Sequence, residues 1–306
     1  MTTAVLPGRR AANRLAASWW ARLAVAAGTL AVLVWRVGTG PFLDGLRTVD
    51  GGALAAAAGL AVLTTVCCAW RWRIVAGGLG IDLPLGTAVA AYYRSLFLNV
   101  TLPGGVVGDV HRGLNHGLRA VAWERSAGQF VQIVLTVAVL LVVPSPVRSA
   151  MPLVAVALLA AVAAVAVAAR VRPEAARSPW ARVRNAAVRD VRRGLLAGRA
   201  WPAIVLASAL VVAGHVATFL IAARTAGATV PPARMVPLVL LVLLAAALPN
   251  IGGWGPREGV TAWAFSAAGL GASLGVATAV VYGVMVFVAS LPGAAVLVVA
   301  WVRRDA

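Results

Sequence analysis

Charged residues lie inside two glycine-rich interruptions of otherwise apolar sequence. The first reads Leu-Pro-Gly-Gly-Val-Val-Gly-Asp-Val-His-Arg-Gly and contains Asp109 and Arg112; the second reads Leu-Pro-Asn-Ile-Gly-Gly-Trp-Gly-Pro-Arg-Glu-Gly and contains Arg257 and Glu258. An anionic group that leaves water needs compensation for its lost hydration, which guanidinium groups and free backbone N–H groups can provide. We therefore expect these four residues to contact an anionic ligand. The alternative is that the two pairs only neutralise one another and hold the fold together.

Further polar residues flank these interruptions. Asp109 and Arg112 are three residues apart, so they share one face if a helix restarts after Gly108. The two nearby histidines could couple movement to protons, or could equally lie at a wet interface. The side chains that we expect to line a cavity are Asn99, His111, His116, Gln129 and Gln132.

The sequence contains no motif for catalysis or for a cofactor. No Gly-x-Ser-x-Gly, phosphate-binding loop or clustered acids with metal-ligand spacing is present. Cys67 and Cys68 are the only cysteines and are adjacent, which argues against a disulfide framework or a zinc site. We expect no catalytic residue, no metal and no cofactor. An enzymatic role for Asp109 with His111 is the minor alternative.

Proline and glycine explain why the helices should stop at these two places. Proline lacks a backbone donor, and glycine adopts backbone shapes that other residues avoid, so each stretch predicts a broken helix at membrane depth. Paired broken segments are the best sequence indication of a transport site. The residues expected to form the breaks are Pro103, Gly104, Gly105 and Gly108 in the first stretch and Pro249, Asn250, Gly252, Gly253 and Gly255 in the second.

The composition places these motifs in a bilayer. The 306 residues are 61% hydrophobic with a mean hydropathy of +0.91, and several apolar runs approach the roughly 20 residues that cross a membrane. We predict an all-α, polytopic helical bundle with about seven or eight hydrophobic segments. The expected segments cover about 19–35, 52–70, 84–101, 127–143, 149–169, 203–223, 236–248 and 274–302, the last kinked at Pro292 and Gly293, and a short apolar stretch lies at 261–270. Pro144-Ser145-Pro146 should close a helical hairpin, and Arg71, Trp72 and Arg73 should anchor a helix end at the interface.

The charge pattern predicts a topology. All 27 basic residues are arginine, against nine acids, for a net charge of +18; a nucleic-acid binder would not carry so much apolar sequence. Residues 170–199 contain nine arginines and are predicted either as an amphipathic helix on an anionic leaflet or as a basic loop. This segment and the N-terminus should be cytoplasmic. It separates one half, about 15–169, from another, about 200–304, within a single transmembrane domain. Positive-inside counting requires the two breaks to re-enter from opposite faces, as in an inverted repeat.

The two broken motifs resemble the signature stretches of the lysylphosphatidylglycerol synthase transmembrane family, also called flippase-like proteins. The resemblance extends loosely over most of the chain, including the run from Tyr92 to Asn99. Val107 departs from the family pattern, which has a glycine there. The resemblance is strongest at Pro103, Gly108, Asp109, Arg112, Pro249, Gly253, Gly255, Arg257 and Glu258.

This resemblance implies a multi-pass plasma-membrane protein that translocates lipid or accompanies a lipid-modifying enzyme. The best-known members add a soluble aminoacyl-transferring domain, and no such domain follows here within 306 residues, so we expect no enzyme activity. The leading expectation is movement of an anionic phospholipid or a polyprenyl-phosphate-linked lipid. The alternative is a non-transporting partner that anchors or regulates a cell-envelope lipid or glycan enzyme. Anionic lipid headgroups are the expected partners, and nucleic acid is not.

Overall fold

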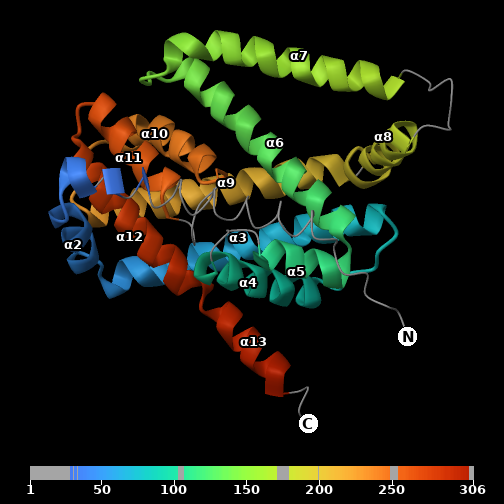
Figure 1. The fold of residues 1–306 in the computed structure, drawn as a ribbon, viewed down its shortest axis with the longest axis horizontal. Coiled ribbons are helices and arrows are strands. Elements are labelled where there is room, and N and C mark those ends of the chain that lie inside the picture. The colour runs from blue at the N-terminus through green and yellow to red at the C-terminus, as the bar shows by residue number, and fades with distance from the viewer. Residues whose placement is uncertain are drawn as a thin grey trace.

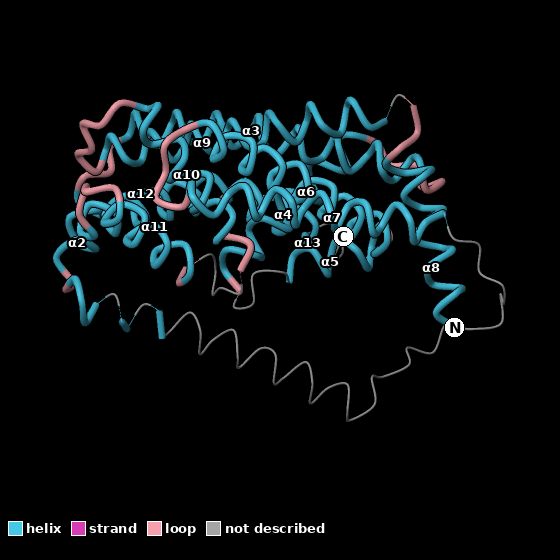
Figure 2. The backbone as a smooth tube through the Cα atoms, turned by 90° about the horizontal axis from the view of Figure 1, so that it is seen from above, coloured by secondary structure: helices cyan, strands magenta, loops and turns pink. Residues whose placement is uncertain are grey.

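All regular structure in the described part of the chain is helical (Figures 1 and 2). The computed structural model describes residues 28–302 except 30, 33, 103–106, 171–178, 199 and 249–253. The predicted first segment, 19–35, therefore lies largely outside the described residues. The helices are α2 (Gly40–Arg47), α3 (Gly51–Gly78), α4 (Leu85–Thr101), α5 (Val107–His116), α6 (Leu118–Val142), α7 (Met151–Arg170), α8 (Pro179–Asp190), α9 (Ala200–Thr225), α10 (Pro232–Ala245), α11 (Pro256–Ala267), α12 (Ala272–Ser290) and α13 (Pro292–Val302), with short helical turns at Arg148–Ala150 and Val191–Leu195.

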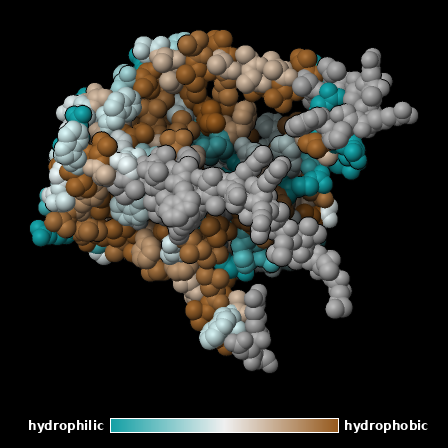
Figure 3. Space-filling view, viewed as in Figure 1, coloured by the Kyte–Doolittle hydropathy of each residue, from teal (hydrophilic) through white to brown (hydrophobic). Residues whose placement is uncertain are grey.

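Among the residues that the structure describes, five helical stretches are long and apolar enough to cross a membrane: Gly51–Gly78, Leu118–Val142, Arg148–Val167, Ala200–Thr225 and Ala272–Val302. They confirm the predicted polytopic helical bundle. The α6–α7 hairpin forms at the Pro-Ser-Pro turn, and the last segment breaks at Leu291, as predicted. Apolar side chains cover much of the molecular face in Figure 3, including α13, which protrudes from the bundle. A large exposed apolar surface of this kind is typical of contact with a membrane or with another protein.

The helices also stop at both glycine-rich stretches, as the sequence predicts. The first interruption separates α4 from α5 and the second separates α10 from α11. Residues 103–106 and 249–253, which include most of the predicted break residues, lie outside the described part of the chain. The described break residues are Gly108, inside α5, and Gly255, immediately before α11.

The packing of α3–α6 is repeated by α9–α12. In this repeat α3 corresponds to α9, α4 to α10, α5 to α11 and α6 to α12. Whenever two of these eight helices pack together, their counterparts pack together as well. Thus α4 packs on α12 while α10 packs on α6, and α3 packs on α12 while α9 packs on α6. The central pair, α3 and α9, maps onto itself and runs side by side in Figure 1.

The repeat is inverted. Arg71 of α3 meets Ser208 of α9, whereas Thr64, earlier in α3, meets Gly214, later in α9. The two helices are therefore antiparallel. Parallel copies of one unit would place their first helices in the same direction, so the observed direction matches the inverted repeat that the charge count predicts.

Each broken helix pair returns to the end of the bundle where it began. The end of α5 and the start of α6 lie beside the α3–α4 connection, where Ile81, Gly117 and Leu118 line one hollow. At the opposite end, Met235 of α10 and Ala268, just after α11, belong to one cluster. Figure 1 shows α8 at the first end and α2 at the second. The pairs thus enter the bundle from opposite ends, and which end faces the cytoplasm stays a prediction.

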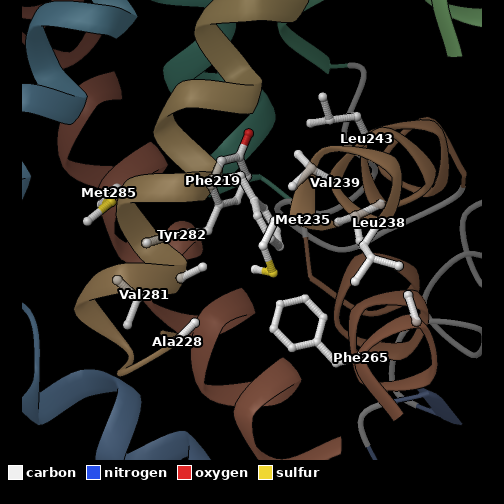
Figure 4. Close-up of a cluster of buried hydrophobic side chains, with 14 of the residues drawn as sticks. Phe219, Ala228, Met235, Leu238, Val239, Leu243, Phe265, Val281, Tyr282 and Met285 are labelled. Atoms are coloured by element: carbon white, nitrogen blue, oxygen red, sulfur yellow. The ribbon is translucent and has the colours of Figure 1, made fainter. Parts of the chain in front are cut away.

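The second half contains the largest apolar core. Three aromatic rings from three different helices meet there (Figure 4). The ring centre of Phe219 lies 6.5 Å from that of Phe265 and 5.3 Å from that of Tyr282. Met235 and Val239 of α10 fill the space beside them. Because Tyr282 also faces the second break, this packing fixes the position of the charged residues there.

The described part of the basic segment forms α8 and the helical turn Val191–Leu195, and it is tied to the bundle. Asp190, at the end of α8, accepts hydrogen bonds from Arg119 and from Trp123 Nε1, the latter at 3.0 Å. Gly194 and Arg193 pack closely against Gly78 of α3. The segment therefore lies at one end of the bundle, opposite α2 (Figure 2).

One predicted feature is wrong. We expected Arg71 and Trp72 to anchor a helix end at the interface, but α3 continues to Gly78 and both side chains are buried. The physical reason is a carboxylate on α6 that compensates the guanidinium charge inside the bundle.

Candidate functional site

Glu124 is the centre of a buried polar cluster beside the first break. One of its carboxylate oxygens accepts hydrogen bonds from Arg71 at 2.5 and 3.0 Å and from the Tyr92 hydroxyl at 3.0 Å. Its other oxygen accepts one from Arg112 Nη2 at 3.1 Å. The Glu124 side chain is 0% exposed. One carboxylate from α6 therefore joins helices α3, α4 and α5.

Arg112 of α5 is enclosed by aromatic rings. Its guanidinium carbon lies 4.4 Å from the centre of the Trp72 ring and 4.1 Å from that of Tyr92. Such cation–π contacts strengthen when water is excluded, and the Arg112 side chain is 0% exposed. Its hydrogen bonds can form only in the plane of the guanidinium group, because all its N–H groups lie in that plane.

Asp109 links this cluster to the break and to solvent. It accepts hydrogen bonds from Ser95 at 3.0 Å, from Asn99 at 3.1 Å, from Arg112 at 3.1 Å and from Arg125 at 2.6 Å. Exposure rises from 0% at Arg112 to 15% at Asp109 and 46% at Arg125. Asn99 also accepts the backbone N–H of Gly108 at 2.8 Å, so it pairs one backbone group that the broken helix leaves free.

The cluster carries one excess positive charge. It contains the three guanidinium groups of Arg71, Arg112 and Arg125 but only the two carboxylates of Asp109 and Glu124. The buried groups balance, because Arg71 and Arg112 face Glu124 and Asp109, and the third guanidinium, that of Arg125, is 46% exposed. The excess charge therefore lies on the solvent side of the cluster, where it can attract an anion.

The second break holds a smaller, balanced pair. Arg257 donates to one oxygen of Glu258 at 2.9 and 2.5 Å, and the backbone N–H of Gly255 donates to the other at 2.6 Å. Both side chains are buried. Arg257 lies 5.4 Å from the Trp254 ring and 5.2 Å from the Tyr282 ring. A paired arginine next to two aromatic rings therefore occurs in both halves.

Glycine is required at two positions for this geometry. Gly255 has a φ of 115°, which side chains rarely adopt, and this places its N–H against Glu258. A Cβ at Gly108 would collide with the backbone of Ser95, so α5 could not approach α4 as closely. Both described break glycines therefore act through the backbone, as the sequence suggested.

An apolar cavity lies where the two halves meet. It is about 80 Å³ and is lined by residues of α3, α4, α9 and α12. Tyr92 lines this cavity and also bonds to Glu124, so one side chain joins the apolar space to the charged cluster. His215 lines it too, with its Nδ1 3.3 Å from the Tyr282 hydroxyl. A second hollow touches Thr101 and Trp254, one residue from each half.

The structure brings together some of the predicted site residues and separates others. Asp109 pairs with Arg112, and Arg257 with Glu258, as the alternative interpretation expects, and contact of these four residues with an anionic ligand stays a prediction. The five residues predicted to line a cavity are not among those that line this one. Asn99 bonds Asp109, His111 lies near Asn115, His116 packs its ring edge against Trp72, and Gln129 and Gln132 are partly buried on α6.

Sequence reasoning missed Arg71, Glu124 and Arg125 as members of the site. None of them lies in a glycine-rich motif. Arg71 follows the predicted segment 52–70 and Glu124 precedes the segment 127–143, so no sequence signal placed these two opposite charges inside the bundle.

The comparisons with known proteins agree with this architecture. The family model described as the lysylphosphatidylglycerol synthase TM region matches residues 19–293. A search of curated proteins found no significant match. The family match covers most of the chain, so the protein belongs to the lysylphosphatidylglycerol synthase transmembrane region family.

Proposed function

We propose that this membrane protein of the lysylphosphatidylglycerol synthase transmembrane region family moves a lipid with an anionic headgroup across the plasma membrane. A translocator must hold a polar headgroup and apolar chains at the same time. The headgroup would contact the charged residues at the breaks, and the chains would lie against the cavity between the halves. No covalent chemistry is needed for this role.

The observation that carries the proposal is the position of Tyr92. Its hydroxyl bonds Glu124 inside the charged cluster, while the residue lines the apolar cavity. A polar and an apolar environment therefore meet at one side chain. This is the arrangement that an amphipathic ligand requires.

The cavity is too small for a whole lipid, because pockets for drug-sized ligands begin at about 300 Å³ and this one is about 80 Å³. Transport would therefore require helices of the two halves to separate. The contact between α4 and α12, which crosses from one half to the other, is where we expect this opening.

The test is a headgroup-accessibility assay in proteoliposomes. Fluorescent phosphatidylglycerol and a panel of other anionic lipids are followed by quenching from outside, with wild type, Arg112→Ala and Arg257→Ala. We expect wild type to expose inner-leaflet lipid and both variants to slow it at least about tenfold, since each loses a buried charge-assisted bond.

Arg189→Ala is the matched control, because Arg189 is exposed on α8 and should retain wild-type rates. The proposal is contradicted if the distribution of every tested lipid between the two leaflets is the same with wild type, with both variants and in empty vesicles. That result would instead favour a non-transporting partner of an envelope-lipid enzyme.

A further inference from the structure

Three buried N–H donors in the first cluster lack an acceptor within the described part of the chain. They are Nε and Nη1 of Arg112 and Nε1 of Trp72. Both side chains are 0% exposed and are in contact, with the Arg112 guanidinium 4.4 Å from the Trp72 ring centre. Buried donors are almost always paired, so unpaired donors on two adjacent side chains point to a ligand.

The geometry restricts how such a ligand can approach. Trp72 and Tyr92 both lie against the Arg112 guanidinium, with ring centres 4.4 and 4.1 Å from its central carbon. Nη2 is already bonded to Asp109 and Glu124. An acceptor can therefore reach only the free nitrogens, in the plane of the guanidinium group. Planar guanidinium donors favour oxyanions, which offer several acceptor atoms at once.

The net charge of the cluster favours a negative ligand. The three guanidinium groups of Arg71, Arg112 and Arg125 share the two carboxylates of Glu124 and Asp109, and the excess positive charge lies at the partly exposed Arg125. A neutral acceptor would pair the free donors of Arg112 but would make no use of this charge. The second break differs, because Arg257 and Glu258 balance each other and neither has an unpaired buried atom within the described residues.

We propose that Arg112 and Trp72 form an enclosed binding site for a phosphate group, present in the first half only. The phosphate could belong to a lipid headgroup or could be free phosphate. The lipid source rests on the proposed function. The ion pair between Arg125 and Asp109, at 2.6 Å, lies on the solvent side of Arg112, so it must open to admit the ligand.

Trp72→Phe tests the site, because it removes the indole N–H and keeps an aromatic ring over Arg112. Binding to the detergent-purified chain is measured by calorimetry with three probes: dihexanoylphosphatidylglycerol, inorganic phosphate and dihexanoylglycerol, which lacks phosphate. We expect wild type to bind a phosphate-containing probe, and Trp72→Phe to weaken that binding about tenfold, as for loss of a hydrogen bond to a charged group. Arg112→Lys should weaken it further, because lysine loses the planar donors.

Trp201→Phe is the matched control, since Trp201 is 52% exposed on α9 and should bind as wild type. Far-UV circular dichroism and gel filtration establish that each variant is folded. Binding of the lipid probe alone assigns a headgroup, and binding of inorganic phosphate shows that the anion alone suffices. The site is refuted if wild type binds neither phosphate probe, if dihexanoylglycerol binds equally well, or if Trp72→Phe binds like wild type.

Binding is measured without transport, so the two proposals fail separately. A protein that binds phosphate at Arg112 but leaves lipid sidedness unchanged contradicts only the proposed function. A protein that moves lipid but shows no effect of Trp72→Phe contradicts only the phosphate site.

Discussion

At the scale of single residues, Glu124 does the most to hold the first cluster together. It is fully buried and bonds Arg71, Tyr92 and Arg112, which come from three helices. A buried ion pair is weak evidence of net stability, but removal of one partner leaves an uncompensated charge. Without Glu124, Arg71 would have no carboxylate partner and Arg112 would keep only Asp109. Its role is thus mainly to make two neighbouring arginines tolerable.

We therefore predict that Glu124→Gln destabilises the protein by about 3–5 kcal/mol, the usual cost of breaking a buried pair. The measurement is denaturant-induced unfolding in detergent micelles. Asp82→Asn removes an exposed carboxylate and should stay within about 0.5 kcal/mol of wild type. A similar small effect for both variants would mean that the arginines find other compensation.

The residue scale also shows where sequence reasoning ends. Asp109, Arg112, Arg257 and Glu258 could be selected because glycine and proline mark their surroundings. The partners on α3 and α6 are separated from the motif in sequence, and Arg71 lies 53 residues from Glu124. Such pairing depends on how helices pack, which no local pattern specifies.

At the scale of elements, α8 and the turn after it behave as one docked unit. The hydrogen bond from Arg119 holds the pKa of Asp190 below its ordinary value, more than burial raises it. A carboxyl group with a lowered pKa in the folded state stabilises that state above the ordinary pKa. The contribution disappears as pH falls through the folded-state pKa.

We predict that α8 stays docked throughout the neutral range and is released only below the ordinary aspartate pKa of about 4. Hydrogen exchange over 182–198, normalised to the intrinsic rate at each pH, should show constant protection above that pH and a loss below it. Asp190→Asn should show the loss already at pH 7, whereas Asp44→Asn, at an exposed acid of α2, should not. Unchanged protection in Asp190→Asn would show that the contact with Gly78 alone holds the segment.

At the scale of the whole molecule, the inverted repeat explains how two short helix pairs can meet near the middle of one bundle. Hydropathy predicted that the chain forms apolar helices. The positions of proline and glycine predicted the two interruptions and the hairpin. The inversion followed from counting arginines, because charge records which loops stay inside. The cavity lining did not follow, since His215 and the threonines around it carry no motif.

We predict that the ends of α5 and α11 face opposite sides of the membrane. Asn115→Cys and Ser266→Cys are both at exposed positions near those ends, in a background where Cys67 and Cys68 are replaced by alanine. A membrane-impermeant maleimide should label Ser266→Cys from outside intact cells and Asn115→Cys only after lysis. Labelling of both positions from one side would exclude the inverted arrangement.

The antiparallel direction of α3 and α9 has a consequence for biogenesis. The opposed sets α3–α6 and α9–α12 exchange places when the bundle is turned upside down, so this core alone does not specify which end faces the cytoplasm. We expect the nine arginines between residues 170 and 199 to set the orientation, because arginine-rich loops resist translocation. We expect a chain without them to enter the bilayer as a mixture of two opposite topologies.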